Sequence, residues 1–169
     1  MGPSPLLRDY AAQLDCAARM LKNEAGTAFP WAPGFSHAPP LQWHESIAAE
    51  RAYVLLWIAA EHAQSASWES RSTSESLKRA ANEFQLAAGC LAHMTTLPLP
   101  APLQDQVPCL RFLMLAQAQE CFWQKAVQDA LKDTTIAKLA QGVSTLYADS
   151  VALAPPAALP PDWLQHMEC

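Results

Sequence analysis

The residue types that most often do chemistry are present, but their spacing does not match a reactive site. The His residues are His37, His44, His62, His93 and His166. None belongs to an HExxH helix of the kind that binds zinc. Cys90 and His93 are three residues apart and could share a helix face, yet no second pair accompanies them, and zinc usually takes four ligands. A core thiol beside a partly exposed imidazole is the simpler interpretation.

Catalytic and phosphate-binding motifs are also absent from the sequence. It contains no GxSxG nucleophile turn, and no GxxxxGK[ST] or GxGxxG loop. Asp129 and Asp133 form a carboxylate pair at helical spacing, but any helix surface offers such pairs, and they are ordinarily solvated. We therefore expect no cofactor, no metal and no enzymatic activity, and the function is to be sought in binding.

Composition describes one apolar, mildly acidic domain. The chain has 169 residues, the size of a single domain. Charged residues make up 16%, against about 25% in typical domains, which indicates a large core or an apolar surface for a partner. A net charge of -5 argues against nucleic-acid binding. The odd number of Cys without CxxC spacing favours a reducing cytosol.

Neither a leader nor an anchor is indicated by the sequence. The N-terminus lacks the basic and apolar segments of a signal peptide. Residues 52–60 form the longest apolar run, about half of the roughly 20 residues that a membrane-spanning helix needs. We interpret this run as the centre of a buried core helix.

Clusters of Pro divide the chain into long stretches rich in Ala and Leu, which predicts an all-α fold of antiparallel helices. The predicted helices cover residues 5–22, 46–65, 74–95, 103–130 and 132–153, with a last short helix from 161–162. Residues 23–44 are predicted to form an irregular strap on the helices, and residues 65–76 a polar loop.

Local signals define the third helix most clearly. Thr73 or Ser74 is a suitable N-cap. The apolar positions recur at helical spacing and predict the inward stripe Leu77, Ala81, Phe84, Ala88 and Leu91. The length and similarity of successive helical units permit a solenoid-like stacking.

Two neighbouring helices carry the sequence block of greatest functional interest. Phe122 and Lys125 are three residues apart, and Thr135 and Leu139 are four apart on the next helix, so each pair shares a helix face. If the helices are antiparallel neighbours, they could form one apolar patch with a basic rim. Ordinary packing between the helices explains the same periodicity and is favoured on periodicity alone.

That block resembles the Alix family of proteins, which are built on the BRO (Bro-one) domain. The family has an LMLAQAQE helix followed by IAKLA, and these stand here as residues 113–120 and 136–140. Residues 50–60 and 77–93 are similar to two further family helices, and the region of Trp43 is similar to a third segment. Order and spacing agree over nearly the whole chain.

The resemblance implies a partial BRO domain over residues 1–169, lacking the N-terminal and C-terminal portions of the family domain. It implies a curved, tetratricopeptide-like array of helices. The abrupt end at Cys169 is then expected of a fragment or a truncated gene.

The activity implied by the resemblance is binding of a partner helix. Such domains bind the C-terminal amphipathic helix of an ESCRT-III subunit, a charged multivesicular body protein, during endosomal sorting. The binding positions correspond to Phe122, Lys125, Thr135 and Leu139. Phe122 and Leu139 would supply apolar contact, and Lys125 would meet acidic residues of the helix. Thr135 replaces a large aliphatic residue of the family, for which Ile136 could compensate by turning outward.

Other branches of the family remain as alternatives. The chain could belong to a Rho-binding, a pH-signalling or a phosphatase-like BRO scaffold, or could be a non-functional truncated fragment. The resemblance implies a cytoplasmic location with the option of peripheral recruitment to endosomes. The acidic net charge disfavours direct binding to anionic lipid.

Overall fold

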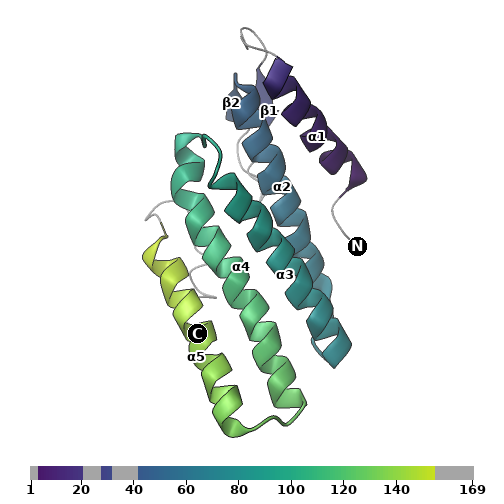
Figure 1. The fold of residues 1–169 in the computed structure, drawn as a ribbon, viewed down its shortest axis with the longest axis vertical. Coiled ribbons are helices and arrows are strands. Elements are labelled where there is room, and N and C mark those ends of the chain that lie inside the picture. The colour runs from purple at the N-terminus through teal and green to yellow at the C-terminus, as the bar shows by residue number, and fades with distance from the viewer. Residues whose placement is uncertain (1–3, 21–27, 32–41, 155–169) are drawn as a thin grey trace.

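The computed structural model describes residues 4–20, 28–31 and 42–154. Within these residues the fold consists of five helices and one pair of short strands. The elements are α1 (Pro5–Met20), β1 (Phe29–Trp31), β2 (Gln42–His44), α2 (Ile47–Trp68), α3 (Ser74–Met94), α4 (Ala101–Gln128) and α5 (Asp133–Ala152). Each helix packs on the next one along the chain, so α1 and α5 lie at opposite edges of the array (Figure 1). The predicted all-α, antiparallel arrangement is confirmed.

The predicted helices agree closely with the observed ones, with small differences at their ends. α2 continues to Trp68, three residues beyond the predicted end, so the loop that precedes α3 is shorter than residues 65–76. α4 begins at Ala101 rather than at residue 103 and contains Pro108 within its length. The predicted final helix from residues 161–162 lies outside the described residues.

Buried residues of α2, α3 and α4 form the main core. α2 begins after Ser46, whose side chain accepts a hydrogen bond from the backbone N–H of Ala49. This hydrogen bond satisfies one of the free backbone donors of the first helical turn. Its Tyr53, Val54 and Leu56 are almost completely buried. All five residues of the predicted inward stripe of α3 are buried as well. A helix that is apolar all round is stable only inside a core.

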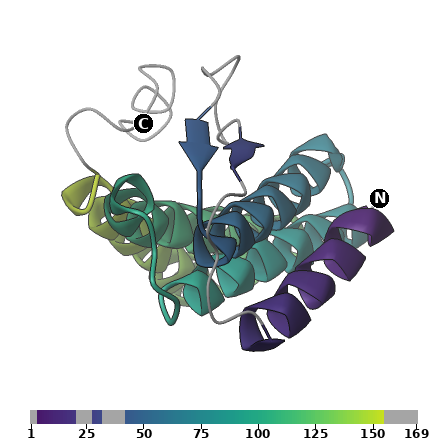
Figure 2. The ribbon, with the colours of Figure 1, turned by 90° about the horizontal axis from the view of Figure 1, so that it is seen from above.

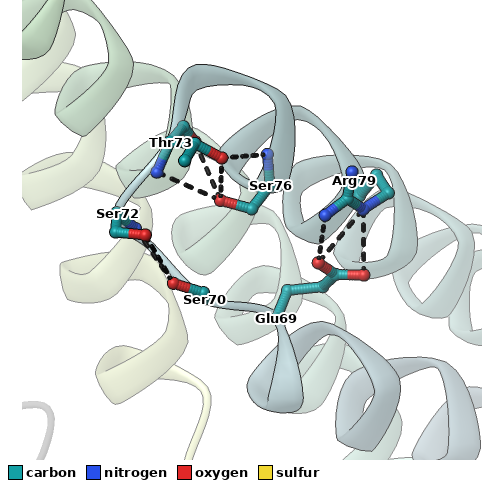
Figure 3. A network of polar contacts seen from close by, with 6 residues as sticks. All are labelled: Glu69, Ser70, Ser72, Thr73, Ser76 and Arg79. Atoms are coloured by element: carbon teal, nitrogen blue, oxygen red, sulfur yellow. Dashed lines mark hydrogen bonds and ion pairs between the residues drawn. The ribbon is translucent and has the colours of Figure 1, made fainter.

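A capping box fixes the start of α3 (Figure 3). The Thr73 hydroxyl accepts from the Ser76 backbone N–H at 3.1 Å, and the Ser76 hydroxyl accepts from the Thr73 N–H at 3.2 Å. Thr73, rather than Ser74, is therefore the N-cap. Arg79, one turn further on, donates three hydrogen bonds to Glu69 at the end of α2 (Figure 3). These contacts hold the turn between α2 and α3 at both of its ends.

The segment predicted to be irregular contains an antiparallel strand pair instead. β1 pairs with β2, with Phe29 opposite His44 and Trp31 opposite Gln42, and both strands stand on one side of the helical layer (Figure 2). Aromatic residues in short extended runs favour such pairing. Residues 32–41, which include Phe35, lie outside the described residues.

The strand pair does lie on the helices, as predicted for the strap. The Trp31 ring stacks on Tyr53, and its indole N–H donates to Glu50. The Tyr10 hydroxyl of α1 donates to the other carboxylate oxygen of Glu50 at 2.5 Å. Glu50 is 2% exposed, and a buried carboxylate needs such donors. One side chain of α2 thus holds both α1 and β1.

Candidate docking surface

Three contacts set the register of α5 against α4. The Ser150 hydroxyl donates to the Cys109 carbonyl oxygen at 3.0 Å. The Tyr147 hydroxyl donates to Glu120 Oε2 at 2.8 Å. Gly142 lies so close to Gln119 that a Cβ on the glycine would be 3.3 Å from Gln119 Nε2. Cys109, early in α4, meets the late residue Ser150 of α5, whereas Gln119 and Glu120, later in α4, meet earlier residues of α5, as antiparallel packing requires.

This register brings Phe122 and Leu139 to the same level of the helix pair. Phe122 follows Gln119 by three residues, and Leu139 precedes Gly142 by three. Each therefore lies about one helical turn from the contact of Gln119 with Gly142, toward the loop that joins α4 to α5. The Phe122 side chain is 36% exposed, and Leu139 is half-buried. Aromatic and aliphatic groups therefore flank the seam between α4 and α5.

Thr135 extends this surface toward the start of α5. It precedes Gly142 by seven residues, two helical turns, and so lies on the face of α5 that meets Gln119. It is exposed. The short, polar side chain contributes less apolar area there than a large aliphatic residue would.

Ile136 lies beside Thr135 and Leu139 on α5. It follows Thr135 by one residue, about 100° around the helix, and precedes Leu139 by three residues, about one helical turn. Ile136 is half-buried. Helical spacing therefore groups Phe122 with Lys125 on α4, and Thr135, Ile136 and Leu139 at adjoining positions of α5, and the compensation of Thr135 by Ile136 stays a prediction.

The charge of the surface is concentrated near the turn between α4 and α5. Lys125 lies one turn beyond Phe122 and forms an ion pair with Asp129 at the end of α4. Their side chains are 25% and 37% exposed. Lys132, the N-cap of α5, and Lys138, in its second turn, are exposed. The rim therefore carries three ammonium groups, one of which already has an acidic neighbour.

A second set of polar contacts holds α5 in place from behind. Glu120 accepts from Arg71 and from Gln124, each at 3.0 Å, as well as from Tyr147. Burial, and then the Glu120 carboxylate, raise the pKa of the Tyr147 phenol. The phenol thus stays protonated and can donate. This network ties α4, α5 and the turn before α3 together.

Sequence reasoning missed three of these residues. Gln119 and Gly142 make the close approach between the helices, and Asp129, which is exposed as expected, also pairs with Lys125. A lone Gly inside a helix is a signal for close approach, and Lys125 and Asp129 have the i,i+4 spacing of a helical ion pair. Both signals were present in the sequence.

The described residues were also compared with the requirements of a metal site and of a membrane-spanning helix. Across residues 4–20, 28–31 and 42–154, no three His, Cys, Asp or Glu side chains gather as a metal site would require. Cys90 is half-buried, with a thiol pKa that burial raises, and His93 is exposed. None of the helices in these same residues is both long and apolar enough to cross a bilayer.

Comparison with known proteins identifies a family whose model matches nearly the whole chain. The BRO1-like domain family model matches residues 3–169. The pH-response regulator palA/RIM20 of Emericella nidulans is 43% identical over 169 residues, 94% of this chain and 20% of the relative. ALG-2 interacting protein X of Dictyostelium discoideum is 34% identical over 134 residues, 75% of this chain and 17% of that protein.

Among solved structures, an ALIX BRO1 complex with CHMP4C is similar, with a TM-score of 0.80 and 26% identity. The match covers 96% of this chain and 50% of the ALIX BRO1 chain. This chain thus spans about a fifth of the length of the curated palA/RIM20 relative.

Proposed function

Because this chain belongs to the BRO1-like domain family, we propose that it is a non-catalytic adaptor that binds the C-terminal amphipathic helix of an ESCRT-III subunit on its α4–α5 surface. One observation carries the proposal. Phe122 and Leu139 flank the seam at one level, with Lys125 one turn further on. An amphipathic helix binds such a surface through apolar anchors, with charged residues at the rim.

Two comparisons support this partner. The similar ALIX BRO1 structure is a complex with CHMP4C. The family match extends over both helices that form the surface. The proposed cellular role is adaptor function in endosomal sorting and multivesicular body formation, from the cytoplasm, with peripheral recruitment to endosomes.

A second candidate is an adaptor in the response to ambient pH. The observation that favours it is the similarity to pH-response regulators of the palA/RIM20 type, at 43% identity in Emericella nidulans. The two candidates differ in the pathway that is served and share the surface. Binding of an ESCRT-III helix at α4–α5 would be common to both.

The direct test is binding of a fluorescently labelled CHMP4C C-terminal helix, measured by anisotropy. The variant Leu139→Asp places a charge on the apolar seam and should abolish saturable binding. Ser144→Asp is the matched control. It adds the same charge to α5 at an exposed position, five residues and about 140° around the helix from Leu139, and should bind as the wild-type chain does.

Circular dichroism of all three chains establishes that each is helical before binding is compared. Binding by the wild type and Ser144→Asp, together with its loss in Leu139→Asp, would support the proposed surface. A helical wild type that does not bind the CHMP4C helix would refute the proposed partner. Equal binding by Leu139→Asp would refute the location.

A further inference from the structure

Lys125 forms an ion pair within the chain itself. Its ammonium pairs with the Asp129 carboxylate one helical turn later, where α4 ends. Both side chains are partly exposed, at 25% and 37%. A carboxylate of a bound helix would therefore meet an ammonium that has an acidic neighbour in contact with it.

We infer that Asp129 is a specificity-determining residue of the α4–α5 surface, where it competes with acidic groups of the bound helix for Lys125. This inference rests on the proposed function. An exposed i,i+4 ion pair is weak because water screens it and both side chains lose freedom. Asp129 can therefore be displaced from Lys125, or share it, at modest cost.

The competition changes the affinity for acidic and for basic partner helices in opposite directions. A helix with a well-placed carboxylate gains Lys125 only after offsetting the contact with Asp129, so its affinity is reduced. A helix with a basic residue at the same position meets Lys125 whose charge is partly neutralised, so it is rejected less strongly. Asp129 thus narrows the difference in affinity between acidic and basic partners, and its removal should widen that difference.

The test compares Asp129→Asn with the wild-type chain in binding the labelled CHMP4C C-terminal helix. Asn has nearly the shape of Asp and lacks its charge. We expect Kd to fall about two- to fivefold at about 0.05 M salt, the range that an exposed ion pair represents. At about 0.5 M salt the difference should largely disappear, because screening weakens exposed charge pairs.

Asp133→Asn is the matched control for net charge. Asp133 is exposed in the first turn of α5, and among the described residues it forms no ion pair with Lys125. It should lower Kd by clearly less than Asp129→Asn does. A probe helix whose Asp and Glu are replaced by Asn and Gln should bind Asp129→Asn and the wild type equally.

A double-mutant cycle with Lys125→Met completes the experiment. The gain from Asp129→Asn should vanish when Lys125 is absent. The inference is overturned if the wild type binds and Asp129→Asn binds no tighter, if Asp133→Asn gives the same gain, or if the gain survives Lys125→Met. A helical wild type without measurable binding would instead refute the proposed function on which the inference rests.

Discussion

At the scale of single residues, Thr135 is the position where this chain can be improved as a binder. It is exposed on the face of α5 that meets Gln119. Thr135→Ile adds apolar area to the surface and should lower the Kd for the CHMP4C helix about fivefold, since the added contact is worth about 1 kcal/mol. Anisotropy titrations measure this change.

The control for this prediction is Thr134→Ile. Thr134 is also exposed, but it lies about 100° around α5 from Thr135. Its replacement should leave Kd unchanged. Equal effects from both variants would mean that the bound helix does not reach Thr135.

Ala130 has a backbone conformation that suits Gly better. Its φ is 48°, in the left-handed region that costs a residue with a Cβ about 1 kcal/mol. The N–H of Ala130 bonds to the Val127 carbonyl and that of Leu131 to the Ala126 carbonyl, the pattern of a Schellman turn, where Gly is usual at this position. Ala130→Gly should raise the free energy of unfolding by about 1 kcal/mol, measured in urea.

Ala137→Gly provides the comparison of opposite sign. Ala137 is exposed within α5, where Gly costs about 1 kcal/mol relative to Ala. It should therefore lower the free energy of unfolding. If Ala130→Gly also lowers it, the strain at the turn is not what limits stability there.

At the scale of elements, the attachment of α1 to α2 should depend on pH. Burial and the hydrogen bond to Glu50 raise the pKa of Tyr10 from 10 to about 12. The folded state therefore favours the protonated phenol, so this contribution to stability is complete below pH 10 and is lost as the pH rises to about 12. Tyr10→Phe should be less stable at pH 7, because Glu50 loses a donor.

The measurement is the free energy of urea unfolding at several pH values. Between pH 10 and 12 the wild type should lose more stability than Tyr10→Phe does. Burial also raises the pKa values of Tyr53 and Tyr147, so both chains should weaken over this range. Parallel curves for the two chains would contradict the assigned role of the Tyr10 hydroxyl.

The elements that could be predicted from the sequence are those with strong local signals. Thr73 and Ser74 were both suitable N-caps by residue type, and the reciprocal hydrogen bonds of Thr73 with Ser76 show which of the two caps the helix. The pairing of β1 with β2 could not be predicted, because residues far apart in sequence form it and only three residues take part on each side. Trp31 of β1 stacks on Tyr53 of α2, and the spacing of apolar residues in the sequence does not predict such a contact between distant segments.

The candidate surface was predictable only in part for a related reason. Helical spacing places Phe122 on one face with Lys125, and Thr135 on one face with Leu139. It does not predict which face of α4 packs against which face of α5. The contacts of Gln119 with Gly142 and of Glu120 with Tyr147 decide this. They place Thr135 on the face of α5 that meets Gln119, with Ile136 about 100° around the helix from it and one turn before Leu139.

At the scale of the whole molecule, burial falls from the centre of the array to its edges. α2 and α3 contain thirteen and nine buried residues. α1 has only Leu14 and α5 only Ser150. Because an element with few buried contacts opens at a lower free energy, the amides of α1 and α5 should exchange with deuterium before those of α2 and α3.

Addition of the CHMP4C helix should then separate the two edges. A partner on the α4–α5 surface stabilises α5 by mass action, so exchange in α5 should slow at saturating peptide. α1, at the far edge of the array (Figure 1), should exchange at its original rate. Leu139→Asp, which should not bind, is the control. Equal slowing in α1 and α5 would indicate a general effect of the peptide on folding, and protection confined to α1 would place the binding surface at the opposite edge of the molecule.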